Sequence, residues 1–110
     1  MGYFAVTRDA GPSWSDETAA FEQPEAGEHE FFMNQLAQEG FLLFAGPLGG
    51  SEADRIRVLL MATADSEAEV RGRLADDPWA RSRRLVTTSI ESWIPIVGLE
   101  RLGPSKTRRA

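Results

Sequence analysis

The sequence predicts a single α+β domain with the element order β-α-β-β-α-β. Three observations carry this prediction. Segments with the alternation or the apolar composition of strands are interleaved with two segments of helical periodicity. A chain of 110 residues has room for one modest core. The chain contains no cysteine, so neither a disulfide framework nor a thiolate zinc site is available to support the fold.

The first strand and a long connection occupy the start of the chain. Residues 3–8 alternate with β-branched and aromatic side chains, as a strand does. Residues 9–24 are rich in Gly, Pro, Ser and Asp, which break regular structure. Trp14 and Phe21 are large apolar side chains in this polar segment, so we expect it to pack down on the domain as a lid.

The first helix is predicted over residues 25–40. It ends at Gly40, because glycine readily adopts the left-handed conformation that closes a helix. At about 100° per residue, His29 falls on the same stripe as Phe32, Met33 and Leu36. The single histidine of the chain therefore faces the core.

The second half of the chain supplies two strands, a helix and a last strand, over residues 41–48, 54–63, 66–77 and 84–97. Ser66 and Glu69 form a capping-box signature at the start of the helix. Pro78 ends it, since a residue before proline is driven out of the helical region. We expect the domain to span residues 1–98, with a basic, flexible tail over residues 99–110.

This element order is typical of a ferredoxin-like domain, with both helices on one face of an antiparallel sheet. Residues 41–45 (FLLFA) and 58–62 (VLLMA) are apolar on both faces of their strands, which is expected when both faces are buried. A second copy packed against the helix-free face would supply that burial. The sequence therefore predicts a homodimer, as a dimeric α+β barrel.

Charge and composition exclude several classes of partner. The net charge of −5 repels phosphate backbones and anionic lipid, so we expect neither a nucleic-acid nor a membrane partner. With one histidine and no cysteine, no metal site is expected. Motifs for a nucleophile, a phosphate loop or a dinucleotide are missing, and no cofactor is expected. No apolar run is long enough to span a bilayer and no signal peptide is recognisable, which favours a cytoplasmic location.

Chain direction brings the polar residues of interest to one edge of the sheet. With right-handed crossovers, the end of the first strand, the start of the first helix, the exit of the second strand, the end of the second helix and the start of the last strand all meet there. His29 and Asp77 are the candidate catalytic residues at this edge. The candidate substrate-binding residues at this edge are Arg8, Trp14, Arg83 and Arg84.

The pairing of His29 with Asp77 suggests acid/base chemistry. A carboxylate beside an imidazole orients the ring, fixes its tautomer and stabilises its protonated form. A structural interpretation stands beside this one. A lone histidine on an apolar helix face is commonly a core residue, and an aspartate before proline is commonly a helix stop. The arginines are suited to an anionic substrate, but they also fit surface pairs with the many acids of the chain.

An ordered series of motifs resembles the YciI-like (YCII-related) family. The series runs through residues 28–33 (EHEFFM), 45–48 (AGPL), 74–79 (LADDPW) and 90–93 (IESW). The resemblance implies a ferredoxin-like fold, a dimeric α+β barrel and an active site around His29 and Asp77, with Gly46 and Pro47 in the pocket wall. The chemistry attributed to that family is dehydrochlorination of a chlorinated hydroxyquinol.

Two classes of function follow from the sequence. The first is a cofactor-independent enzyme, of lyase or dehydrochlorinase type, in which a His29–Asp77 dyad acts on a small hydroxylated or aromatic molecule. The second is a non-catalytic dimeric module that binds a small ligand or another protein. An enzyme requires His29 to be reachable through a pocket, whereas a packing histidine is sealed.

Overall fold

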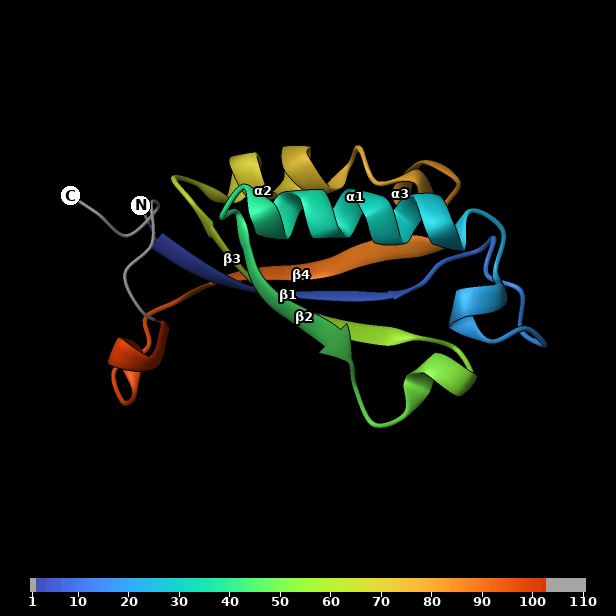
Figure 1. Ribbon diagram of the computed structural model, residues 1–110, viewed down its shortest axis with the longest axis horizontal. Coiled ribbons are helices and arrows are strands. Elements are labelled where there is room, and N and C mark those ends of the chain that lie inside the picture. Colours follow the sequence, from blue (N-terminus) through green and yellow to red (C-terminus); the bar gives the residue numbers. More distant parts are fainter. Residues whose placement is uncertain (1, 103–110) are drawn as a thin grey trace.

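The computed structural model describes residues 2–102 and shows one four-stranded antiparallel sheet with helices on one face (Figure 1). The strands follow the spatial order β2-β3-β1-β4. They are β1 (Gly2–Ala10), β2 (Leu42–Pro47), β3 (Arg57–Ala64) and β4 (Leu85–Trp93), and the helices are α1 (Ala26–Gln38), α2 (Glu67–Leu74) and α3 (Pro78–Arg81). This arrangement confirms the predicted ferredoxin-like α+β fold.

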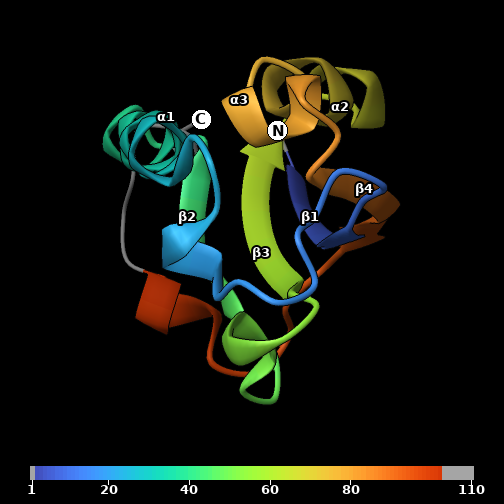
Figure 2. The same ribbon diagram turned by 90° about the vertical axis from the view of Figure 1, so that its right-hand side faces the viewer.

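The core lies between the sheet and the helices. Figure 2 shows α1 beside α2 and α3 above the sheet. Val6 of the central strand β1 pairs with Leu60 of β3 and Ile90 of β4, and these side chains point toward the helices. The buried residues of this layer are Val6, Leu36, Phe41, Leu42, Leu60, Ala62, Ala64, Val70 and Leu74.

Two predicted helix ends are confirmed. The Ser66 hydroxyl accepts a hydrogen bond from the backbone N–H of Glu69 at 3.1 Å, as the capping signature requires. Gly40 follows α1 with φ of 86°, a conformation that a side chain would strain.

The predicted end of the second helix was wrong. The helix stops at Leu74. Pro78, which was predicted to end this helix, begins a separate short helix, α3. Asp77 is extended, with φ of −61° and ψ of 130°, because the residue before a proline avoids the helical region. Proline suits the first helical position, since its missing N–H has no partner there in any case. The result is a bend that carries Asp77 inward.

The last strand is shorter than predicted. It ends at Trp93 and does not reach residue 97, because Pro95 lacks the N–H that would continue the ladder. Leu99–Leu102 form a 3₁₀ turn within the predicted tail, and residues 103–110 of that tail lie outside the described residues. No helix within residues 2–102 combines the length and the apolar character needed to cross a membrane. The cytoplasmic location stays a prediction.

The sheet face away from the helices carries large exposed apolar side chains. Phe44 is 53% exposed, Trp93 43% and Leu59 38%. They come from three strands, and strand pairing places them on the face opposite Val6 and Leu60. In contrast, Met61 on the same face is only 2% exposed.

Candidate functional site

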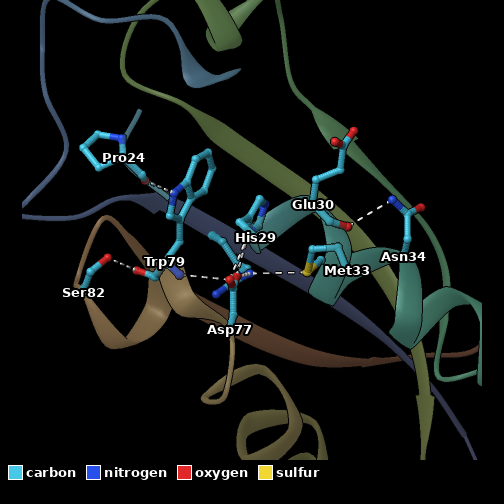
Figure 3. Close-up of polar contacts among 9 residues, drawn as sticks. Pro24, His29, Glu30, Met33, Asn34, Asp77, Trp79 and Ser82 are labelled. Carbon is cyan, nitrogen blue, oxygen red and sulfur yellow. Dashed lines mark hydrogen bonds and ion pairs between the residues drawn. The ribbon is translucent and has the colours of Figure 1, made fainter. Parts of the chain in front are cut away.

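Three segments far apart in sequence meet at one carboxylate. Asp77 accepts a hydrogen bond from Nδ1 of His29, which lies 2.9 Å from both carboxylate oxygens (Figure 3). Arg8 from β1 donates Nη1 to Oδ2 at 2.9 Å. The backbone N–H of Trp79 donates to Oδ1 at 3.0 Å. The structure therefore brings the two predicted catalytic residues into direct contact and adds an arginine to them.

Local sequence explains why the carboxylate is available to all three donors. Because Pro78 starts α3, Asp77 is the residue that caps this helix, and its side chain turns back to the N–H of Trp79. The same bend directs the carboxylate toward α1. His29 lies in the first turn of α1, on the side that faces α3, so the two groups meet without any long side chain between them.

Trp79 fixes the orientation of the imidazole. Its indole ring stacks on the His29 ring with centroids 4.0 Å apart and planes 10° apart. The indole N–H donates to the backbone oxygen of Pro24 at 2.8 Å, which holds the ring at the start of α1 (Figure 3). His29 is thus clamped by a carboxylate at one edge and an aromatic plane on one face.

Charge and burial act together on Asp77, which is 0% exposed. Burial disfavours its ionised form and is the largest single influence on its pKa. The hydrogen bond and charge of His29, the charge of Arg8 and the N–H of Trp79 jointly outweigh burial, so the pKa of Asp77 lies below its ordinary value of 3.8. For Arg8, burial prevails over the pairing with Asp77, and the pKa of its guanidinium is lowered.

We expect this lowered pKa to make stability depend on pH at the acid end. The stabilisation by Asp77 is fully present above its unfolded-state pKa, and it is lost as pH falls through the lower folded-state pKa. Urea unfolding of the wild type between pH 6 and pH 2, about the range over which carboxylates titrate, should show a falling free energy of unfolding. Asp77→Asn should flatten this slope, whereas the neighbouring surface variant Asp76→Asn should keep it. Equal slopes in wild type and Asp77→Asn would contradict the assignment.

A cavity of about 540 Å³ opens beside the imidazole. The His29 side chain is 18% exposed, so it is reachable from this space. The wall combines the start of α1, the end of β2, the connection before α1 and the inner face of the sheet. It is lined by Arg8, Ala20, Phe21, Ala26, Gly27, His29, Glu30, Met33, Asn34, Ala45, Gly46, Pro47, Glu52, Ile56, Val58, Trp79 and Leu85.

The predicted binding residues divide into two groups. Arg8, Gly46 and Pro47 line the cavity together with His29. The other three do not line it. Trp14 is buried behind Trp79, which it contacts edge-on with centroids 5.5 Å apart, and its indole N–H donates to the backbone oxygen of Asp54.

Arg83 and Arg84 are also placed away from the cavity. Arg84 forms an ion pair with Glu25 at 3.2 Å. Arg83 has φ of 64°, and its backbone oxygen accepts a hydrogen bond from the N–H of Ser13. Both residues belong to the turn between α3 and β4 and hold the long connection to it. Topology placed them at the correct edge, but side-chain direction could not be derived from topology.

Sequence reasoning missed the role of Trp79. Trp79 is 3% exposed, and its stacking on His29 was not predicted from the sequence. The signal was its position two residues after Asp77, which ties its backbone to the same carboxylate. Phe21, predicted to pack down on the domain with Trp14, is 77% exposed, and it contributes to the cavity wall from a 3₁₀ turn in the long connection. The buried Gln23 braces that connection through bonds to Ser15 and Thr18.

Among the described residues, no group of three or more metal-binding side chains lies close enough together to hold an ion. At the cavity, His29 is a side chain that could transfer a proton; Asp77 is its hydrogen-bond partner, and Arg8 is a buried positive charge beside that carboxylate.

No model of a known protein family matches the chain, and no curated protein matches it. A solved structure does: 5-chloro-2-hydroxyhydroquinone dehydrochlorinase (TftG) from Burkholderia phenoliruptrix AC1100, in complex with 2,5-dihydroxybenzoquinone. The TM-score is 0.63 over 84% of this chain and 93% of that chain, with 20% sequence identity. A similarity at this identity shows a shared fold, which is the fold that the resemblance to the YciI-like family implied.

Proposed function

We propose that the chain is a cofactor-independent enzyme of the YciI-like type that performs acid/base chemistry with the His29–Asp77 dyad. The observation that carries this proposal is the placement of His29: Nδ1 is held by Asp77, while the ring borders an open cavity. A histidine that served packing alone would be sealed from solvent. The similarity of the fold to a dehydrochlorinase supports the same conclusion.

Each group has a defined task in this proposal. An ionised carboxylate can only accept, so Nδ1 of His29 carries a hydrogen and Nε2 is the nitrogen with a free lone pair. Nε2 makes no hydrogen bond within residues 2–102 and is the atom that takes the proton. Asp77 then stabilises the imidazolium that forms. Arg8 adds to the effect of His29 in keeping Asp77 ionised, and it does so without touching the imidazole.

The cavity suits a small planar molecule. Trp79, Phe21 and Met33 supply apolar walls, and the volume of about 540 Å³ lies in the usual range for small-molecule sites. We propose a hydroxylated aromatic substrate, with elimination of HCl as the reaction to test first. This reaction balances without an oxidant: a proton leaves the substrate for His29, the carbon–chlorine bond breaks, and chloride departs with the bonding electrons.

The test is chloride release from 5-chloro-2-hydroxyhydroquinone, the compound in the name of the similar enzyme. We expect wild-type protein to release chloride faster than buffer alone does. His29→Gln should lose this release. NMR of the single imidazole reports binding in the same samples. Binding of 2,5-dihydroxybenzoquinone at His29 with no turnover of any hydroxylated aromatic substrate would support the ligand-binding module instead.

We also propose that the chain forms a homodimer through the helix-free sheet face. The exposed side chains of Phe44, Leu59 and Trp93 support this proposal, since a face of this composition is most stable when covered. The strands that carry Phe44 and Leu59 also carry Ala45 and Val58, which line the cavity from the opposite face of the sheet. Dimer formation would thus stiffen the sheet on which the site is built.

Leu59→Asp is expected to convert the dimer to a monomer, because it places an unpaired charge in the covered face. Leu59 is a better site than Met61, whose burial within one protomer would make the same change an unfolding mutation. Light scattering at micromolar protein measures the mass. Phe31→Asp, on the exposed side of α1, is the control and should keep the wild-type mass. A wild-type monomer would refute the dimer.

A further inference from the structure

The buried guanidinium of Arg8 is only partly used by the protein. Nη1 pairs with Asp77 at 2.9 Å, but Nε and Nη2 are buried and have no hydrogen-bond partner among the described residues. The Arg8 side chain is 1% exposed, and the residue lines the cavity beside His29. Buried donors of a charged group normally have partners, so two unpaired ones at a cavity wall require an explanation.

The two unpaired atoms form one recognition edge. In a guanidinium group, Nε–H and the adjacent N–H of Nη2 point in parallel and form a fork that matches two oxygen atoms in one plane. Asp77 uses the remaining nitrogen, Nη1, and leaves this fork whole. A lysine could hold Asp77 equally well as a point charge, but it could not present such a fork.

We propose, on the basis of the function proposed above, that the Nε–Nη2 edge of Arg8 binds a pair of adjacent, coplanar oxygen atoms of the substrate that share one negative charge. An aromatic carboxylate and two neighbouring oxygens of a hydroxylated ring both have this chemistry. Arg8 thereby sets the orientation of the ring relative to His29. It is a binding residue as well as the charge that keeps Asp77 ionised.

The charges around the cavity limit the ligand to a single negative charge. Arg8 and Asp77 neutralise each other within the site, and the exposed carboxylates of Glu30 and Glu52 also line the cavity. A dianion would be repelled by these two glutamates. A monoanion is favoured, because its charge faces the fork and an imidazole that becomes positive when it takes the proton.

Met33 contacts the guanidinium group of Arg8 and lines the same cavity. Its sulfur lies 4.0 Å from Nη1. Methionine is unbranched and has three rotatable bonds, so it shifts more easily than the aromatic wall. In this proposal, rotation of Met33 gives the ligand access to the guanidinium group of Arg8.

Binding of matched pairs of small compounds tests the proposal. Benzoate is compared with benzyl alcohol, and catechol with phenol, by NMR titration of the wild-type protein. We expect the two-oxygen member of at least one pair to bind about tenfold more tightly or better, as for a charge-assisted bidentate contact. The pair that shows the preference identifies the source of the oxygens. Arg8→Lys should abolish the preference, and Arg84→Lys, an arginine outside the cavity, should keep it.

If Arg8→Lys does not fold, the NMR resonance of the Arg8 Nε–H in the wild-type protein provides the test. This resonance should move downfield when the two-oxygen compound of a pair binds, and it should stay in place with the one-oxygen compound. Equal affinity within both pairs, or ligands that shift His29 while the Arg8 resonance stays in place, would overturn the proposal. Such a result would leave acid/base catalysis intact, because chloride release and its loss in His29→Gln are measured separately.

Discussion

Replacing His29 by alanine is expected to reduce turnover by about 10²- to 10⁴-fold, the usual contribution of a positioned proton acceptor. The loss should appear in kcat, because Nε2 acts on the substrate after it is bound. Chloride release from 5-chloro-2-hydroxyhydroquinone measures the effect. The fold should persist, since His29 is a partly exposed side chain at the start of α1.

The control for this variant is Gln35→Ala, an exposed position on the same helix that does not line the cavity with His29. It should retain the wild-type rate within about twofold, since it removes no group that transfers a proton. Loss of activity in Gln35→Ala as well would indicate a fault in helix α1 rather than in catalysis. Full activity in His29→Ala would remove the dyad from the mechanism.

Replacing Asp77 by alanine is expected to destabilise the protein by about 3–5 kcal/mol, because it leaves the charge of Arg8 buried and unpaired. It also removes the cap of α3. Urea unfolding at pH 7 measures this change. The neighbouring Asp76 provides a matched control. Its ion pair with Arg81 is exposed, so Asp76→Ala should change the free energy of unfolding by about 0.5 kcal/mol or less.

Asp77→Asn separates the roles of the carboxylate. The amide oxygen can still accept from the N–H of Trp79, so α3 remains capped, while the charge that faces Arg8 and His29 is gone. We expect it to be less destabilising than Asp77→Ala and still to lower turnover. If Asp77→Ala proved as harmless as Asp76→Ala, the charge of Arg8 would have to be compensated by other groups.

Much of the fold could be predicted from the sequence because its signals are local. The strand alternation in β1, the capping pair Ser66 and Glu69, and the terminating Gly40 each act within a few residues. Two of the boundaries that differ, the end of the second helix and the end of the last strand, lie close to prolines, whereas the start of β3 at Arg57, against residue 54 in the prediction, does not. The effects of Pro78 and Pro95 were harder to predict, because a proline can end one element or begin another. Which of the two occurs depends on the neighbouring parts of the chain.

The site was predictable only as far as topology reaches. Chain direction alone places His29 and Asp77 at one edge, and their contact follows from the packing of α1 beside α3. Arg8 was expected near the substrate, but its pairing with Asp77 depends on which face of β1 it occupies. The side chain of Trp14 turns away from the cavity because a partner for its indole N–H lies at Asp54. Such choices are made by tertiary contacts and leave no local pattern.

One consequence concerns how this site would change among related chains. Asp77 receives bonds from His29, Arg8 and Trp79, so it supports the fold as much as any reaction. Selection for folding alone would preserve it in descendants that have lost catalysis. His29 is under no such constraint, since its removal leaves Asp77 with two other donors. Under the proposed function, a lineage that lost the chemistry would be free to lose the histidine, whereas it would keep the aspartate for as long as the chain has to fold.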